Sequence, residues 1–265
     1  VGDPQLATLA TVCGVVFLGG LVKGTAGFGY AIVSTAVLAT LFSPTVAVVV
    51  MILPMLAGNI RLLGELERTE IPRCLARFWP YLLGAAVGTL AGMALLGRIP
   101  RPVLAPGLGL FTLAYVVATQ PWVALPGEAW VHARCFRPGT AAKLGMGLVS
   151  GIVFGATNAA VQVVAYLDSL DLDRQTFVGV LAMILVGISL LRLAAAWGLG
   201  LFAAGDATPV TLVGLSAFAA VPGLVGVAAG QRLRKRLAER TITAGALLLL
   251  TVIGVKLLVD GIGGL

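Results

Sequence analysis

Basic side chains inside apolar stretches are the residues of this sequence best placed to do chemistry. Lys23, Arg61, Arg192 and Lys256 each lie within a run of hydrophobic residues. A charge at membrane depth costs at least ~2.5–3.5 kcal/mol on insertion scales, so the charges that remain there are functional candidates. Lys256 has Asp260 four residues later, the spacing of a structural ion pair on a helix. The other three cations are predicted to bind a small anion.

Lys23 opens a glycine-rich break with the sequence Lys-Gly-Thr-Ala-Gly-Phe-Gly. Successive glycines let the backbone turn and leave N–H groups that can face a ligand. We therefore predict that Gly24 and Thr25 join Lys23 in holding an anion. The alternative is a lysine that extends its ammonium group to the membrane surface.

A second break, Ala-Thr-Asn-Ala-Ala, covers residues 156–160. Thr157 and Asn158 can cap the helix that follows, and the N-terminus of that helix carries about half a positive charge. Gln162 lies one turn further along. We predict that these three side chains and the backbone at Gly155 contact the ligand, with capping or hydrogen bonding between helices as the alternative.

Arg192 is followed by Leu-Ala-Ala-Ala-Trp, so it lies inside its apolar segment. A guanidinium can hold a sulfonate or a carboxylate through two parallel hydrogen bonds. Arg61 is nearer a loop and has Glu65 four residues on. It is predicted to bind the same ligand, with anchoring at the membrane interface or a structural ion pair with Glu65 as the alternatives.

The composition requires membrane helices to position these residues. Of 265 residues, 59% are hydrophobic and 11% are charged, whereas soluble domains carry about 25% charged residues. With 35 glycines, which allow close helix packing, the chain is predicted to be an all-α polytopic membrane protein in a lipid bilayer. The N-terminal segment 1–21 lacks the basic region of a signal peptide and is expected to be mature structure.

Other classes of protein find little support. The net charge of +7 fits basic cytoplasmic loops better than nucleic-acid binding. The single histidine, His132, lies outside the apolar segments, and no span holds a carboxylate pair, so no enzyme activity is expected. Cys13, Cys74 and Cys135 are far apart and form no CxxC pair, so neither a disulfide nor a metal site nor another cofactor is predicted.

The sequence contains an internal repeat. Gly20, Gly24 and Gly27 align with Gly151, Gly155 and Asn158 at an offset of 131, which also places Arg61 on Arg192. Further on, Pro80, Gly84 and Gly88 align with Pro222, Gly226 and Gly230 at an offset of 142. The glycine series that include these positions are predicted to make close helix contacts rather than ligand sites. Transporter folds are often built from two such copies. The predicted division is a first repeat at 1–120, a connecting segment at 121–142 and a second repeat at 143–265.

Each copy is predicted to begin with a glycine-interrupted segment, either a re-entrant hairpin or a broken span, and to continue with three ordinary spans. This gives about eight membrane segments. In the first copy they are 5–41, 46–63, 79–96 and 103–119; in the second they are 143–167, 177–197, 209–229 and 241–259.

The loop charges favour inverted copies. In that arrangement twelve basic residues face one side and two, Arg98 and Arg101, face the other, whereas parallel copies give eight against six. Cytoplasmic loops carry the excess of Lys and Arg, so we predict inverted repeats with both termini outside. The two breaks would then approach one another at the membrane midplane and surround one small anion.

These motifs resemble the TauE/SafE family of sulfite and organosulfonate exporters. The resemblance rests on Gly19-Gly20-x2-Lys23-Gly24-x2-Gly27-Phe28-Gly29, Gly147-x3-Gly151-x3-Gly155-x2-Asn158, Tyr166-Leu167 and Pro222-x3-Gly226-x3-Gly230-x-Arg232. It implies a duplicated bundle of about eight spans that moves small anions such as sulfite or sulfonates outward. Many members carry further glycines in the second break, where this chain has Asn158-Ala159-Ala160.

The resulting hypothesis is a secondary transporter in the inner or plasma membrane that exports a small sulfur-containing anion by alternating access to a site at the two breaks. An anion channel with the same charged constriction is the alternative, and a membrane scaffold is a third. The sequence leaves open whether the protein is a monomer or a homodimer.

Overall fold

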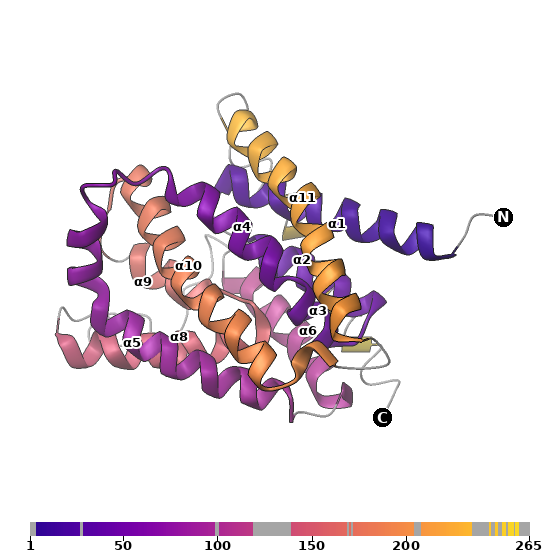
Figure 1. The fold of residues 1–265 in the computed structure, drawn as a ribbon. Helices are drawn as coiled ribbons and strands as arrows, with labels where there is room; N and C mark the ends of the chain where they lie inside the picture. Colours follow the sequence, from indigo (N-terminus) through magenta and orange to yellow (C-terminus); the bar gives the residue numbers. More distant parts are fainter. Residues whose placement is uncertain are drawn as a thin grey trace. The chain divides into compact units, whose positions relative to one another are not determined.

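The computed structural model describes residues 4–26, 29–98, 101–118, 139–168, 170, 172–203 and 208–234, together with scattered positions of 244–259. Across these residues the secondary structure consists of helices joined by short turns, as the composition predicts (Figure 1). The bounds of the helices before the connecting segment are α1 Pro4–Ala26, α2 Tyr30–Leu41, α3 Pro44–Val50, α4 Ile52–Leu63, α5 Ile71–Leu96 and α6 Arg101–Ala118. Those after it are α8 Thr140–Thr157, α9 Val161–Asp168, α10 Arg174–Gly198, the short 3₁₀ helix η1 Leu201–Ala203 and α11 Pro209–Leu233.

Six helical stretches of the described chain are long and apolar enough to cross a membrane. They are Thr8–Thr25, Pro44–Leu63, Ile71–Leu96, Thr140–Thr157, Gln175–Gly198 and Pro209–Leu233. The predicted span 103–119 corresponds to α6, which is helical but is not one of the six, and the predicted span 241–259 lies largely outside the described residues. Eight segments and inverted copies therefore stay predictions.

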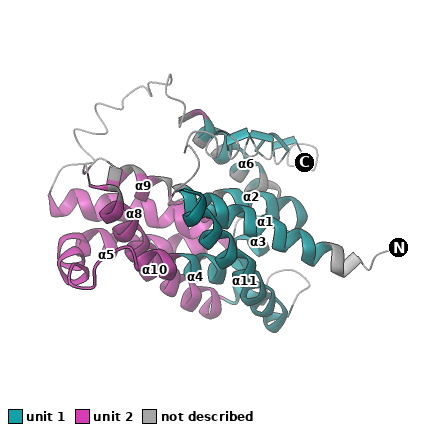
Figure 2. Ribbon diagram, turned by 90° about the horizontal axis from the view of Figure 1, so that it is seen from above, with its two compact units in different colours: residues 1–58, 99–116, 200–265 teal, residues 59–98, 117–199 magenta. Residues whose placement is uncertain are grey.

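The helices fall into two compact units (Figure 2). One unit contains residues 1–58, 99–116 and 200–265, and the other contains 59–98 and 117–199. Each unit contains helices from both predicted sequence repeats. The reason lies in two glycine seams, one in each unit.

The first seam joins α1 to α11. A β-carbon added at Gly20 or Gly24 would collide with the backbone of Gly223 or Val227 on α11. In return, a β-carbon at Gly226 would collide with the carbonyl oxygen of Phe17 on α1. The residue numbers of the contacting pairs increase in the same direction along both helices, so α1 and α11 run parallel. Their backbones are in direct contact, as small residues allow.

The second seam joins α5 to α8 and repeats this geometry. Gly84, Gly88 and Gly92 face the carbonyl oxygens of Leu144, Leu148 and Ile152, one turn apart on α8. Three glycines of α8 face α5 in the same way, and these are Gly147, Gly151 and Gly155. The prediction that these glycines make close helix contacts is confirmed. In both seams the first membrane segment of one copy packs on the third membrane segment of the other copy.

The contacts correct the predicted alignment of the third spans. With the breaks aligned at 131, Gly24 corresponds to Gly155, and their partners Val227 and Thr89 differ by 138. The offset of 142 that places Pro80 on Pro222 is therefore wrong by one helical turn. Glycines repeat every four residues in both spans, so a shift of one turn still places glycine on glycine.

One join between helices depends on a serine from α11. The carbonyl of Val50, at the end of α3, would normally accept from residue 54, but Pro54 has no N–H. The Ser216 hydroxyl donates to this carbonyl at 2.7 Å and accepts from the N–H of Leu53 at 3.3 Å. Ser216 therefore satisfies both backbone groups where α3 passes into α4.

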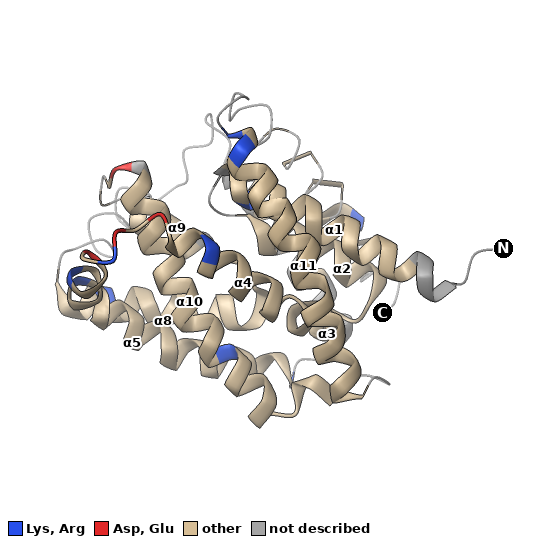
Figure 3. Ribbon diagram, turned by 45° about the horizontal axis from the view of Figure 1, so that its top comes forward, with Lys and Arg blue, Asp and Glu red and all other residues tan. Residues whose placement is uncertain are grey.

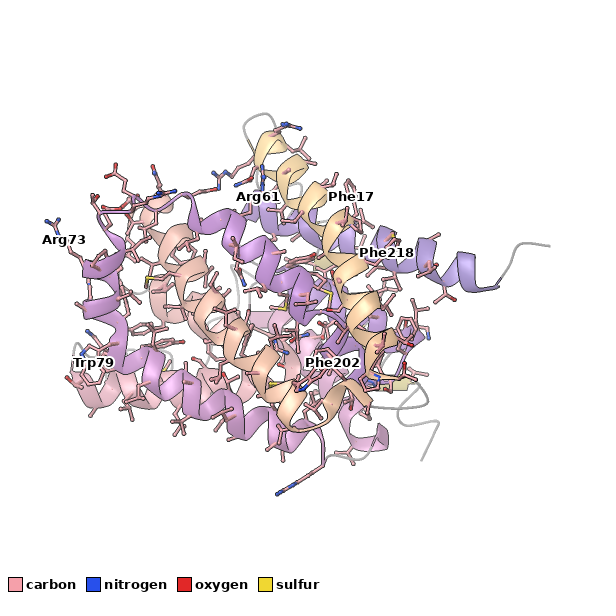
Figure 4. The ribbon with its side chains drawn as sticks, in the orientation of Figure 1. Phe17, Arg61, Arg73, Trp79, Phe202 and Phe218 are labelled. Atoms are coloured by element: carbon pink, nitrogen blue, oxygen red, sulfur yellow. The ribbon has the colours of Figure 1, made fainter. Side chains whose placement is uncertain are left out.

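Large apolar side chains on the outer faces suit a lipid environment. Trp79 and Phe218 are each about half exposed, at 53% and 50%, and point outward from α5 and α11 (Figure 4). Charged residues instead gather in the segment that links α4 to α5 (Figure 3). No Asp or Glu occurs in any of the six apolar stretches found in the described chain.

Candidate functional site

The second break forms where predicted. Helix α8 ends at Thr157, and Asn158 adopts a left-handed conformation with φ of 65° while its N–H donates to the carbonyl of Phe154. Asparagine tolerates this conformation better than most residues. The Thr157 hydroxyl donates to Val153 at 2.6 Å and accepts from the N–H of Ala159 at 3.2 Å. Thr157 thus holds the turn by hydrogen bonds to backbone on both sides of the break.

After this break the chain folds back. Tyr166 on α9 stacks on Tyr81 of α5, with ring centroids 4.7 Å apart. Tyr81 lies at the level of Gly147, whereas Gly155 near the end of α8 lies at the level of Thr89, two turns further along α5. Helix α9 therefore returns along the α5–α8 pair, and the break is the bend of a helical hairpin.

Arg192 is buried beside this break. Its side chain is 0% exposed, and its Cζ atom lies 4.9 Å from the centroid of the Phe154 ring, within the range of a cation–π contact. Among the residues that the structure describes, none hydrogen-bonds to its Nε, Nη1 or Nη2 atoms. Burying an ion costs several kcal/mol, and a desolvated cation–π contact contributes about 2 kcal/mol or more. The ring therefore offsets only part of the cost, and the guanidinium is available to an anion.

Several buried neutral polar groups in the same unit also lack partners in the described chain. Two of them are close to Arg192 or to the break in sequence: the Oγ atom of Ser189, which is 0% exposed, and the Oε1 atom of Gln162 near the start of α9. Asn158 is fully buried as well. Its backbone bond to the carbonyl of Phe154 places it one turn beyond the ring that contacts Arg192.

The first break forms at the end of the predicted stretch 23–29 and not at Lys23 itself. Lys23, Gly24 and Thr25 belong to the last turns of α1, and the turn centres on Gly29, whose φ of 89° suits glycine. The expectation of free backbone amides at Gly24 is wrong, because its backbone is helical and faces α11. Thr25 donates to the carbonyls of Leu21 and Val22 at 3.0 and 2.8 Å.

Lys23 is nevertheless buried, at 3% exposure. Its Cδ and Cε atoms lie 3.5 Å from the point where a β-carbon at Gly58 would stand, and the Tyr30 ring reaches the same point. Tyr30 is the first residue of α2, and one turn later the Ser34 hydroxyl donates to the carbonyl of Val15 on α1 at 3.4 Å. Helix α2 therefore runs antiparallel to α1, so this break too is the bend of a hairpin.

Arg61 differs from its counterpart Arg192. It lies in the last turn of α4 and its side chain is exposed. This position agrees with the alternative of an anchoring residue near a loop. Its role in ligand binding stays a prediction.

The predicted residues thus form two groups. Lys23, Gly24 and Thr25 share the end of α1 in one unit, while the other unit contains Arg61, Gly155, Thr157, Asn158, Gln162 and Arg192. That the two breaks bind one and the same ligand stays a prediction. Sequence reasoning missed Phe154, Ser189 and Tyr30; the position of Ser189 one turn before Arg192 was the signal that could have identified it.

A family model described as "Sulfite exporter TauE/SafE" matches residues 12–257. The chain belongs to the TauE/SafE family. This match covers nearly all of the chain, including both breaks and both glycine seams of this TauE/SafE protein. No curated protein and no solved structure shows significant similarity to it.

The TauE/SafE family is a family of transporters, not of enzymes. The family and the six apolar helices together indicate a multi-pass membrane protein.

Proposed function

We propose that the protein is a secondary transporter that exports a small sulfur-containing anion, sulfite or an organosulfonate, across the cell membrane. Membership of the TauE/SafE family supports this class of cargo. The observation that carries the proposal is Arg192, a fully buried guanidinium whose nitrogens have no hydrogen-bond partner among the described residues.

The chemistry of Arg192 suits an oxyanion. A guanidinium presents its N–H groups in a planar fork that matches two oxygens of a carboxylate, phosphate or sulfonate group. The Phe154 ring covers the guanidinium and leaves the hydrogen bonds in its plane to the ligand. No acidic residue occurs in the six apolar stretches of the described chain. In this proposal the compensating negative charge is that of the cargo.

Alternating access supplies the transport step in this proposal. A site with differential affinity in two conformations, reached from one side of the membrane at a time, moves its cargo as the populations shift. The helical hairpins that carry Asn158 and Gly29 are the elements we expect to move. The sequence further predicts that Lys23, Gly24, Thr25 and Arg61 assist.

Flux of labelled sulfite in proteoliposomes tests the proposal. Saturable flux is expected for the parent protein, and Arg192→Ala should abolish it. Arg192→Lys, which keeps the charge but loses the planar fork, should retain only a small part. Arg73→Ala is the matched control, since Arg73 is exposed and points outward from the start of α5 (Figure 4).

Three outcomes would count against the proposal. Flux that survives Arg192→Ala would remove Arg192 from the site. Large unitary currents without saturation would favour an anion channel over a carrier. Binding of cations or neutral solutes with no anion binding would reject anion transport altogether.

A further inference from the structure

Ser189 lies one turn before Arg192 on α10. Residues three apart on a helix share a face, so their side chains are neighbours. Both are 0% exposed, and neither the Ser189 Oγ nor a guanidinium nitrogen has a hydrogen-bond partner within the described part of the chain. A buried donor left unpaired costs about 1–3 kcal/mol. The hydroxyl and the guanidinium share one face of α10, so one ligand can serve as the partner that the described residues do not supply to either group.

The geometry around Arg192 limits what that partner can be. Phe154 covers the guanidinium, so a ligand meets the N–H groups in the plane of the fork. The fork takes two oxygens of one anion. A carboxylate has no further oxygen, whereas sulfite and sulfonates have a third. The neighbouring hydroxyl is a neutral donor of the kind that a third oxygen requires.

The internal repeat gives an independent comparison. At the offset of 131, Ser189 corresponds to Gly58 and Arg192 corresponds to Arg61. The copy with the buried arginine has the hydroxyl, and the copy with the exposed arginine has no side chain at that position.

We propose that Ser189 donates a hydrogen bond to the third oxygen of an anion held by Arg192, and thereby makes the site favour sulfonates and sulfite over carboxylates. This inference rests on the proposed function, since it needs an anion on Arg192.

Methanesulfonate and acetate provide a matched pair of probes, because each joins one methyl group to the anionic group. Their inhibition constants against labelled sulfite flux would be measured for the parent protein, Ser189→Ala and Ser189→Thr, and Arg192→Ala would be run beside them to record the loss of flux. We expect Ser189→Ala to weaken methanesulfonate about tenfold or more, the effect of losing one hydrogen bond to a charged group, and to leave acetate unchanged. Ser189→Thr keeps the hydroxyl and should restore most of the preference.

The melting temperature separates binding from folding. Ser189→Ala removes a hydroxyl that has no partner in the described residues, so the ligand-free protein should melt at the same temperature or higher. Ser216→Ala is the contrasting control: it loses two backbone contacts and should melt lower while keeping the selectivity ratio.

An unchanged selectivity ratio in Ser189→Ala would overturn the role of Ser189, and so would a parent protein that binds both probes equally. If Arg192→Ala still abolishes flux in that case, the proposed function stands. If Arg192→Ala has no effect, the proposed function itself fails.

Discussion

Replacing Arg192 by methionine should stabilise the ligand-free protein and abolish its transport. Methionine is unbranched, apolar and flexible enough to fill the space along α10. The substitution removes a fully buried charge for which the described residues offer no hydrogen-bond acceptor. Stability and function should therefore change in opposite directions, which a purely structural arginine would not allow.

The magnitude follows from two opposing terms. Burial of the guanidinium costs several kcal/mol, and its contact with the Phe154 ring at 4.9 Å returns about 2 kcal/mol or more. Replacing buried ionic groups by apolar side chains stabilises proteins by about 1–4 kcal/mol in measured cases. For a chain of this size each kcal/mol corresponds to about 2–4 °C in melting temperature.

Thermal unfolding of the detergent-solubilised protein, with and without sulfite, measures both effects. The parent protein should gain stability as sulfite is added, because a ligand that binds only the folded state raises its stability by mass action. Arg192→Met should have a higher melting temperature than the parent protein without sulfite, and added sulfite should not raise it further. A melting temperature several degrees below that of the parent protein would refute the reasoning, since it would mean that Arg192 holds the fold together.

Three further predictions concern the folded protein. Gly226→Ala should destabilise the protein by about 1–3 kcal/mol, because the new β-carbon would collide with the backbone of α1. Gly214→Ala, on the same helix, is the control: its β-carbon has no neighbour within contact distance, so it should be neutral or stabilising. Equal melting temperatures for the two variants would contradict the close packing of α1 on α11. Ser216→Ala should cost about 1–3 kcal/mol for each backbone group it leaves unsatisfied, and an unchanged denaturation midpoint would argue against that bridge. Asp173 caps α10 through the N–H groups of residues 175 and 176, and its hydrogen bonds with Thr176 hold its carboxyl pKa below the usual 3.8. A carboxyl pKa that is lower in the folded than in the unfolded protein adds stability at pH values above 3.8, and this stability is lost as the pH falls through the folded-state pKa. Asp173→Ala should therefore make the free energy of unfolding depend less on pH in this acid range. An acid unfolding profile identical to that of the parent protein would count against the role of Asp173.

Much of the fold could be predicted because hydrophobic length and glycine spacing are direct consequences of membrane physics. The second break at Asn158 and the packing role of Gly84, Gly88 and Gly226 followed from the sequence and hold in the structure. The depth of Arg192 was also apparent, since it is surrounded by apolar residues.

Register and partner choice could not be predicted. A glycine face records that a backbone comes close, but it carries no side chain that specifies which backbone or at which turn. For this reason the offset of 142 was wrong by four residues, and the pairing of α1 with α11 could not be derived. Lys23 was placed in a turn because glycines follow it, yet Gly24 is helical since its contact with α11 favours an unbroken helix.

Among the described residues each copy has one buried cation, and the two cations lie on different helices of the repeat. At the offset of 131, Lys23 corresponds to Phe154 and Gly58 to Ser189. In one copy the cation is Lys23, whose methylene groups pack against Gly58. In the other, Arg192 lies over Phe154, in the position where the first copy has its lysine. Arg61, the counterpart of Arg192 in the copy that has Lys23, is exposed. Each unit therefore has one buried positive charge among its described residues, supplied by a different residue in each, as the proposed binding of small anions would require.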